Sequence, residues 1–255
     1  MVRHTILPSN ASHTLITIHQ LICGRLHAPP RPAAVCRCLL LEDESGLALV
    51  DTGIGLADVK APQQRLGQPL IDAAGFQFHE PDTAIRQIES LGRNPARLRH
   101  IVLTHGDPDH VGGLADFPAA TVHMAAEEHR AIAAGNPRYV PVQFAHEPRW
   151  KIYDSQPRPW FGLAARPVDL GMSGEVLLVP LPGHTLGHCG VAIEQGDRWL
   201  LHVGDAIYVR GELESDDHPI AALWQAMAVD DAQRRTSLSN CGGSSATTAT
   251  RSSWG

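Results

Sequence analysis

The sequence predicts a protein of the α/β class, on three observations. Short apolar runs of strand length, bounded by Gly, Pro and Asp, recur along the chain. Segments with apolar residues at helical spacing lie between several of these runs. One predicted strand, residues 101–103, leads directly into a loop that carries the imidazoles and carboxylates of His105, Asp107, Asp109 and His110. Because a strand end is rigid, the third observation also marks a candidate site.

The predicted elements follow from these patterns in chain order. Strands are expected at residues 14–23, 34–42, 47–50, 101–103, 120–124, 175–180, 190–194 and 199–203. Helices are expected at residues 82–91, 125–134 and 221–238. Asp82 can cap the first helix. In the second helix, Glu127 and Glu128 are expected on the side that faces solvent.

Length and composition limit the class of protein. A chain of 255 residues with 43% hydrophobic and 19% charged residues suits one large globular domain or two small ones. The net charge of −6 and the lack of basic clusters argue against nucleic acid or an anionic membrane as partner. No apolar run approaches the ~18 residues of a membrane helix. Neither a signal peptide nor a disulfide framework is recognisable, so we expect a cytoplasmic protein.

Two segments depart from the regular pattern. Residues 136–171 are rich in Pro, Arg and aromatic residues, and this predicts a long loop that either covers the site as a lid or merely packs on the core. Residues 239–255 show no periodicity and too little apolar character to order themselves. We therefore expect one domain over residues 1–238, followed by a disordered tail or one that is out of frame or truncated.

The loop after the strand at residue 101 indicates a metal site. Its imidazoles and carboxylates would repel or desolvate one another unless a cation lay between them. A polar turn is the alternative, and an isolated His would favour it. Neutral imidazoles and carboxylates suit zinc, and they also suit iron and manganese.

The loop resembles the His-x-His-x-Asp-His signature of the metallo-β-lactamase-fold hydrolases, with Asp107 where the second His usually stands. Further matches follow in the family's order: the Asp51-Thr-Gly turn, the PGHTLGH run at residues 182–188, and the Gly-Asp pair that ends at Asp205. The resemblance covers about residues 14–235. It implies a four-layer αββα sandwich of two mixed β-sheets, with helices outside and the metal site at the sheet ends.

The resemblance also implies two divalent metal ions, zinc in the first instance. One ion would be held by His105, Asp107 and His184, and the other by Asp109 and His110, with Asp205 bridging the two. The exchange of a family His for Asp107 makes the first site more negative and shifts the expectation towards iron or manganese. In the family a last His completes the second site, but no His follows His218 here. We therefore expect the second site to be incomplete.

Such a pair of metal ions supports hydrolysis by a metal-bound hydroxide. Asp109 could orient the hydroxide or accept its proton. The Asp-x-x-Tyr segment at residues 205–208 resembles the lactonase branch of the family, and Tyr208 is either an oxyanion donor or a buried core tyrosine. We predict an enzyme, a metal-dependent hydrolase of a small ester, lactone or thioester, with a small molecule as partner and a homodimer left open. The alternatives are a diiron-type oxidoreductase and a metal-binding but inactive truncated protein.

Overall fold

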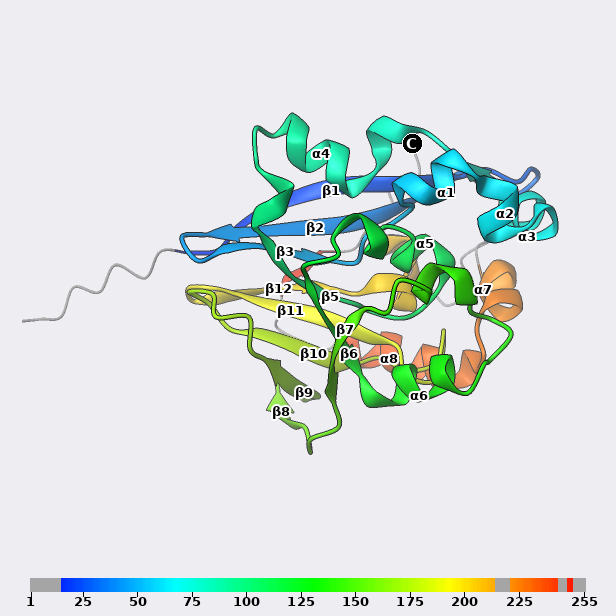
Figure 1. Ribbon diagram of the computed structural model, residues 1–255. Coiled ribbons are helices and arrows are strands. Elements are labelled where there is room, and N and C mark those ends of the chain that lie inside the picture. Colours follow the sequence, from blue (N-terminus) through cyan, green and yellow to red (C-terminus); the bar gives the residue numbers. More distant parts are fainter. Residues whose placement is uncertain (1–14, 214–220, 243–246, 250–255) are drawn as a thin grey trace, which may run out of the picture.

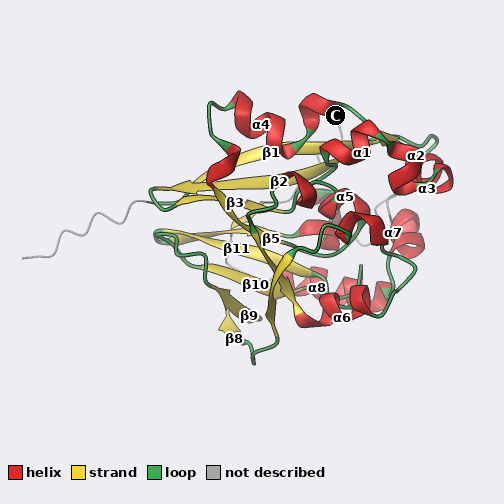
Figure 2. Cartoon of the chain, in the orientation of Figure 1, coloured by secondary structure: helices red, strands yellow, loops and turns green. Residues whose placement is uncertain are grey.

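Two β-sheets lie face to face with helices on both outer sides, in four layers (Figures 1 and 2). The structure is a computed structural model, and it describes residues 15–213, 221–242 and 247–249. The architecture confirms the predicted αββα sandwich. The apolar layer between the sheets joins Leu39 and Leu41 of the first sheet to Leu178 and Ile193 of the second.

The first sheet has the strand order β4-β1-β2-β3-β5-β6-β7. Its strands are β1 (Thr17–Leu26), β2 (Ala34–Asp43), β3 (Gly46–Val50), β4 (Phe76–Gln77), β5 (Leu98–Val102), β6 (Thr121–Ala125) and β7 (Arg149–Tyr153). Pairing is antiparallel from β4 to β3 and parallel from β3 through β5 and β6 to β7. The carboxyl ends of β3 and β5 therefore meet at one edge.

The second sheet has the order β13-β12-β11-β10-β9-β8. Its strands are β8 (Arg158–Trp160), β9 (Leu163–Val168), β10 (Val176–Pro180), β11 (Cys189–Gln195), β12 (Arg198–His202) and β13 (Thr247–Ala249). All pairs are antiparallel except β12 with β13, which is parallel. Both sheets are thus mixed, as predicted.

The helices cover the outer faces and one end of the sandwich. They are α1 (Leu56–Lys60), α2 (Pro62–Leu66), α3 (Gln68–Ala74), α4 (Ala84–Ser90), α5 (Pro108–Val111), α6 (Ala126–Ala133), α7 (Ala221–Met227) and α8 (Asp231–Gly242). Ile88 of α4 packs on the outer face of the first sheet, and Leu238 of α8 packs on the outer face of the second. Among the described residues, no helix is long and apolar enough to cross a membrane.

Three local expectations were wrong. The helix expected at residues 221–238 is two helices, α7 and α8, separated at residues 228–230. Asp82 lies in a short 3-10 turn, and Thr83 is the residue that precedes α4. Glu128 does not face solvent but is completely buried, because its carboxylate accepts hydrogen bonds inside the protein.

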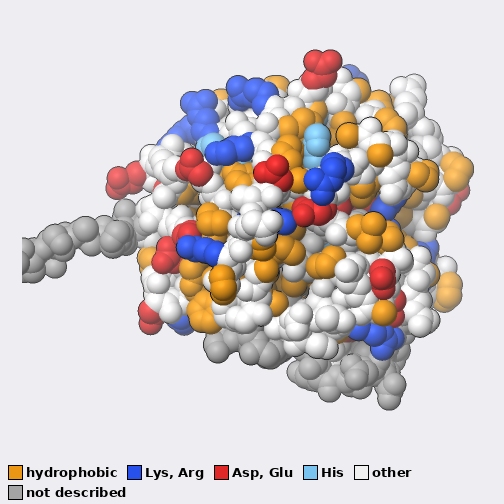
Figure 3. Space-filling model, turned by 90° about the horizontal axis from the view of Figure 1, so that it is seen from below, with side chains coloured by type: hydrophobic (Ala, Val, Ile, Leu, Met, Phe, Trp, Pro, Cys, Tyr) orange, Lys and Arg blue, Asp and Glu red, His pale blue; other side chains and the backbone are white. Residues whose placement is uncertain are grey.

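Residues 136–171 are not one long loop. They supply β7 at the edge of the first sheet and β8 and β9 at the edge of the second. Trp150 packs against His129 and Phe144, and Trp160 packs against Trp199 in the core of the second sheet. These contacts give both tryptophans a packing role. Acidic and basic side chains are both distributed over the face shown in Figure 3.

Candidate metal centre

The centre forms where loops from both sheets meet at one end of the sandwich, near α5 and α7 (Figure 1). His105 and Asp107 follow β5, and Asp109 and His110 lie in the single turn of α5. His184 lies in the turn between β10 and β11, and Asp205 follows β12. The structure thus brings together all six residues that sequence proposed as metal ligands.

Two groups of donor atoms lie close enough to hold a cation. In the first group, ligand atoms of His105, Asp107 and His184 lie within 4.8 Å of one another. In the second, those of His105, His110 and Asp205 do so. His110 Nε2 is 3.2 Å from Asp205 Oδ1 and 3.8 Å from Asp109 Oδ2. His184 Nε2 is 3.5 Å from Asp205 Oδ2, so Asp205 lies between the groups.

The chemistry of this donor set fits a divalent cation. His105 Nε2 is buried and has no hydrogen-bond partner, although it lies 3.3 Å from Asp107 Oδ2. The other ring nitrogen of His105, Nδ1, is 2.9 Å from Thr104 Oγ1. A buried nitrogen lone pair among carboxylates is costly without a partner, and a cation supplies one. Imidazole and carboxylate ligands are those that zinc, iron and manganese accept.

Asp51 contacts His110 of the second group on the ring nitrogen that faces away from the centre. Its Oδ1 accepts the backbone N–H of Thr104 at 2.8 Å, and its Oδ2 accepts the Thr104 hydroxyl at 2.8 Å. The same Oδ2 is 2.8 Å from His110 Nδ1. Burial opposes ionisation, but His110 and His202 hold the pKa of the Asp51 carboxyl below its usual value. Asp51 therefore orients His110 with Nε2 towards the centre, and is more than a turn residue.

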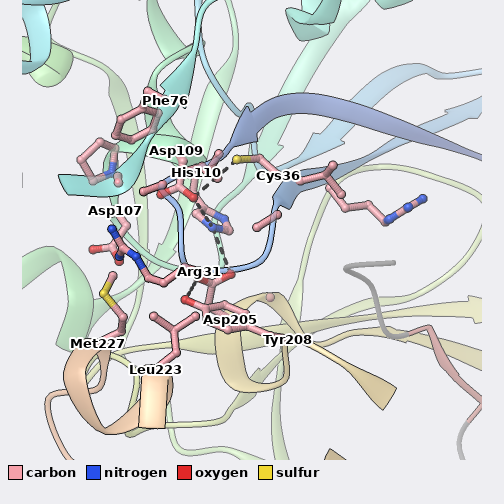
Figure 4. A pocket seen from close by; sticks show the side chains of 18 of the residues that line it. Arg31, Cys36, Phe76, Asp107, Asp109, His110, Asp205, Tyr208, Leu223 and Met227 are labelled. Carbon is pink, nitrogen blue, oxygen red and sulfur yellow. Dashed lines mark hydrogen bonds and ion pairs between the residues drawn. The ribbon is translucent and has the colours of Figure 1, made fainter. Parts of the chain in front are cut away.

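The carboxylates of the centre differ in their ionisation. Burial and the neighbouring Asp205 raise the pKa of Asp109, although His110 opposes this. Burial also disfavours the charged form of Asp205, but His110 and His184 hold the pKa of Asp205 well below its usual value. The Cys36 thiol donates to Asp109 Oδ2 at 3.4 Å (Figure 4). Asp109 is thus the carboxylate of this pair that takes up a proton more readily.

Tyr208 lines the cavity at the centre and is not a core tyrosine. Its hydroxyl donates to Asp205 Oδ2 at 3.0 Å (Figure 4). Burial, followed by the charges of Asp205 and Asp109, raises the pKa of Tyr208 well above its usual value. The phenol therefore stays protonated and able to donate a hydrogen bond.

A cavity of about 280 Å³ opens beside the ligands. Asp107, Asp109, His110 and Asp205 lie at its polar end. Its other walls are largely apolar and come from β1, β2, β4, α3 and α7: Leu26, Val35, Phe76, Leu70, Leu223 and Met227. Figure 4 shows Phe76, Leu223 and Met227 around the cavity. The cavity therefore suits a small molecule that has an apolar part and a polar reacting group.

Sequence reasoning missed Arg138. Its Nε and Nη2 donate to Asp107 Oδ1 and Oδ2 at 2.6 and 2.5 Å, and its Nη2 is 2.9 Å from His184 Nε2. Burial opposes the charge, but Asp107 raises the pKa of Arg138 above its usual value. The signal available in the sequence was indirect: a carboxylate in place of a family His requires a compensating positive charge.

Two other buried residues position the ligand loops. Glu128 accepts the Gly106 N–H and the Tyr139 hydroxyl on Oε1, and the Thr185 hydroxyl on Oε2. His188 accepts the backbone N–H of Asp205 on Nε2 at 3.1 Å, and its Nδ1 lies 3.0 Å from the Leu181 carbonyl. His188 thus has the structural, hydrogen-bonding place expected from sequence.

Within the described part of the chain, the two donor groups contain no histidine other than His105, His110 and His184. The strand that follows α8 is β13, which contains Thr247, Thr248 and Ala249. His218 lies outside the described residues.

Comparisons with known proteins agree with this fold and site. The sequence-family model of the metallo-beta-lactamase superfamily matches residues 31–243 of this chain. A probable metallo-hydrolase of Mycobacterium tuberculosis is 45% identical over 206 residues, which are 78% of this chain and 65% of that protein. The N-acyl homoserine lactonase AiiA of Bacillus thuringiensis subsp. kurstaki is 27% identical over 199 residues, 77% of this chain and 73% of that protein. A solved structure of an N-acyl homoserine lactone hydrolase, with N-hexanoyl-L-homoserine bound at its catalytic metal centre, has a TM-score of 0.68 at 22% identity and covers 89% of this chain and 88% of that one.

The fold and the donor groups define a metal-binding protein of the αββα class. The chain belongs to the metallo-beta-lactamase superfamily, as its four ordered motifs predicted. It spans about 65% of the length of the mycobacterial metallo-hydrolase. The likeness to the solved lactone hydrolase, at 22% identity, shows the shared fold.

Proposed function

We propose that this protein is a metal-dependent hydrolase that cleaves a small ester or lactone with an apolar acyl part. One observation carries the proposal: two groups of imidazole and carboxylate donors lie at the polar end of a largely apolar cavity of about 280 Å³, which Asp107, His110 and Asp205 of these groups line. The names of the relatives support it, since one is a probable metallo-hydrolase and another an N-acyl homoserine lactonase. A thioester would fit the same cavity.

A divalent cation in such a centre lowers the pKa of a bound water from ~15.7 to about 7 and polarises a carbonyl. The residues of the chain supply the rest. Asp109 would accept the proton of the attacking water, because it lines the polar end of the cavity with its Oδ2 3.8 Å from His110 Nε2. Tyr208, whose hydroxyl donates to Asp205 Oδ2 in the structure, would turn this hydrogen bond to the carbonyl oxygen as negative charge develops there.

Asp109 alone carries the transferred proton in this reaction. Water adds to the carbonyl carbon, and the bond from that carbon to the ester or ring oxygen breaks. The proton accepted by Asp109 then passes to the departing oxygen, so the carboxylate is regenerated. The apolar walls at Phe76, Leu223 and Met227 exclude bulk water from the acyl part.

Turnover of a substrate panel tests the proposal. Protein loaded separately with zinc, manganese or iron should hydrolyse esters, lactones or thioesters whose acyl chains vary in length. Asp205→Asn should lose at least about 100-fold in kcat/KM, which corresponds to ~2.7 kcal/mol. His79→Ala is the matched control, because His79 is exposed and outside the cavity. Absence of turnover on every substrate with every metal would overturn the proposal and favour the inactive-protein alternative.

A further inference from the structure

Arg138 occupies one of the two donor groups. We propose that its guanidinium stands permanently in the group of Asp107 and His184, so that the centre holds a single divalent cation, in the group of His105, His110 and Asp205. The inference rests on the proposed metal-dependent function and deepens it. It replaces the expected pair of metal ions with one metal ion and one fixed organic cation.

The contacts of the guanidinium leave no room for a second metal ion in its group. Arg138 Nη2 lies 2.5 Å from Asp107 Oδ2 and 2.9 Å from His184 Nε2. A zinc ion bound to the same oxygen and nitrogen would lie ~2.0–2.2 Å from each. It would then overlap Nη2, because both would need the same small volume. Binding of a metal ion in this group therefore requires Arg138 to leave.

Contacts outside the acidic cluster hold Arg138 in place. Its Nη1 donates to the Met227 carbonyl at 2.9 Å, and its backbone N–H donates to Asn136 Oδ1 at 3.0 Å. The next residue, Tyr139, donates its hydroxyl to the buried Glu128 at 2.8 Å. The Met227 carbonyl and the contacts of the neighbouring backbone thus also hold the guanidinium, and its position does not depend on Asp107 alone.

The charges of the pair also balance. Asp107 adds one negative charge relative to the neutral His of the family motif, and Arg138 adds one positive charge. Arg138 Nε and Nη2 each donate a hydrogen bond to one carboxylate oxygen of Asp107. This two-bond geometry is the one in which a guanidinium binds a carboxylate best. The substitution that sequence reasoning took as making the site more negative is therefore neutralised within the site.

The second group remains available to a cation. His105 Nε2 is buried and makes no hydrogen bond. His110 Nε2 and Asp205 Oδ1 lie 3.2 Å apart, and Asp109 Oδ2 is 3.8 Å from the same His110 nitrogen. Two imidazoles and two carboxylates are a sufficient protein ligand set for one divalent cation.

Metal stoichiometry tests the inference without relying on turnover. Metal-depleted full-length protein is titrated with zinc or cobalt(II), and bound metal is measured by elemental analysis and by the cobalt absorption spectrum. Wild type should bind one equivalent. The paired variant Asp107→His with Arg138→Met keeps the charge of the site and should bind two. Arg130→Met, an exposed arginine of α6, is the matched control and should bind one.

The outcomes separate the inference from the proposed function. Two equivalents in wild type, with hydrolysis of the substrate panel, would overturn the inference and leave the function. A paired variant that folds but still binds one equivalent would also overturn it, because Arg138 would then not be what excludes the second ion. If wild type binds no metal and hydrolyses nothing, both fail. One equivalent in wild type and two in the paired variant would support the inference.

Discussion

Removal of the Glu128 carboxylate should loosen both ligand loops at once. Glu128 is fully buried and accepts three hydrogen bonds: from Gly106 N–H at 2.8 Å, from the Tyr139 hydroxyl at 2.8 Å, and from the Thr185 hydroxyl at 2.7 Å. Gly106 lies between two of the proposed ligands, and Thr185 follows a third. Glu128→Ala would therefore leave three donors without their acceptor.

The size of the effect follows from these contacts. A hydrogen bond to a charged group contributes ~1.5–3 kcal/mol, and the three bonds share one carboxylate, so their losses are not additive. We expect Glu128→Ala to lower the free energy of unfolding by about 3–5 kcal/mol. For a chain of this length that corresponds to a fall in melting temperature of about 10 °C. Glu128→Gln keeps one acceptor oxygen and should cost about 1 kcal/mol.

Urea and thermal unfolding followed by circular dichroism would measure these changes. Glu89→Ala is the control, since Glu89 is an exposed glutamate of α4 that pairs with the partly exposed Arg86. It should change stability by less than about 1 kcal/mol. If Glu128→Ala were as stable as Glu89→Ala, Glu128 would not tie the loops together, and the reasoning would be refuted.

Three further predictions concern other parts of the chain. Burial raises the pKa of Asp116 from its usual value to about 6, so the folded state loses stability as pH rises from about 4 through 6. The free energy of unfolding of Asp116→Asn, measured in urea, should exceed that of wild type by at most about 3 kcal/mol at pH 8 and should equal it at pH 4. Asp51→Asn should weaken metal binding ~10–100-fold in a chelator competition, because the contact with His110 Nδ1 is impaired; unchanged affinity would contradict the orienting role. Trp160→Ala should lower the free energy of unfolding by about 3–5 kcal/mol without changing kcat/KM. A variant of unchanged stability with an altered kcat/KM would instead support a lid role for residues 136–171.

The sequence predicted the strands from local apolar patterns, whereas the sandwich and the full ligand set were predicted from the motifs shared with the metallo-β-lactamase family. Apolar runs such as residues 47–50 and 176–180 are strands buried on both faces, and their short length favours a strand over a helix. The ligand motifs stand at strand ends, so topology alone brings them to one edge of the sandwich. His105 and Asp205 lie far apart in sequence but share one donor group for this reason.

The remaining features depend on contacts between distant segments. Glu128 has the sequence context of an exposed helical residue, and only its three partners explain its burial. Residues 136–171 contain short edge strands with Pro and Arg, a composition that does not distinguish strand from loop. Arg138 lies in this segment, and its position opposite Asp107 required the fold. The proposed frame change after residue 238 stays a prediction that sequencing of the gene tests.

The ligands are shared between the two halves of the sandwich. His105 and His110 follow a strand of the first sheet, whereas Asp205 follows a strand of the second. A bound ion would therefore act as a clamp across the interface, and its binding energy would resist separation of the halves. At a free metal concentration of a hundred times Kd this adds about 2.7 kcal/mol to stability. Chelation should then increase hydrogen exchange in both sheets together.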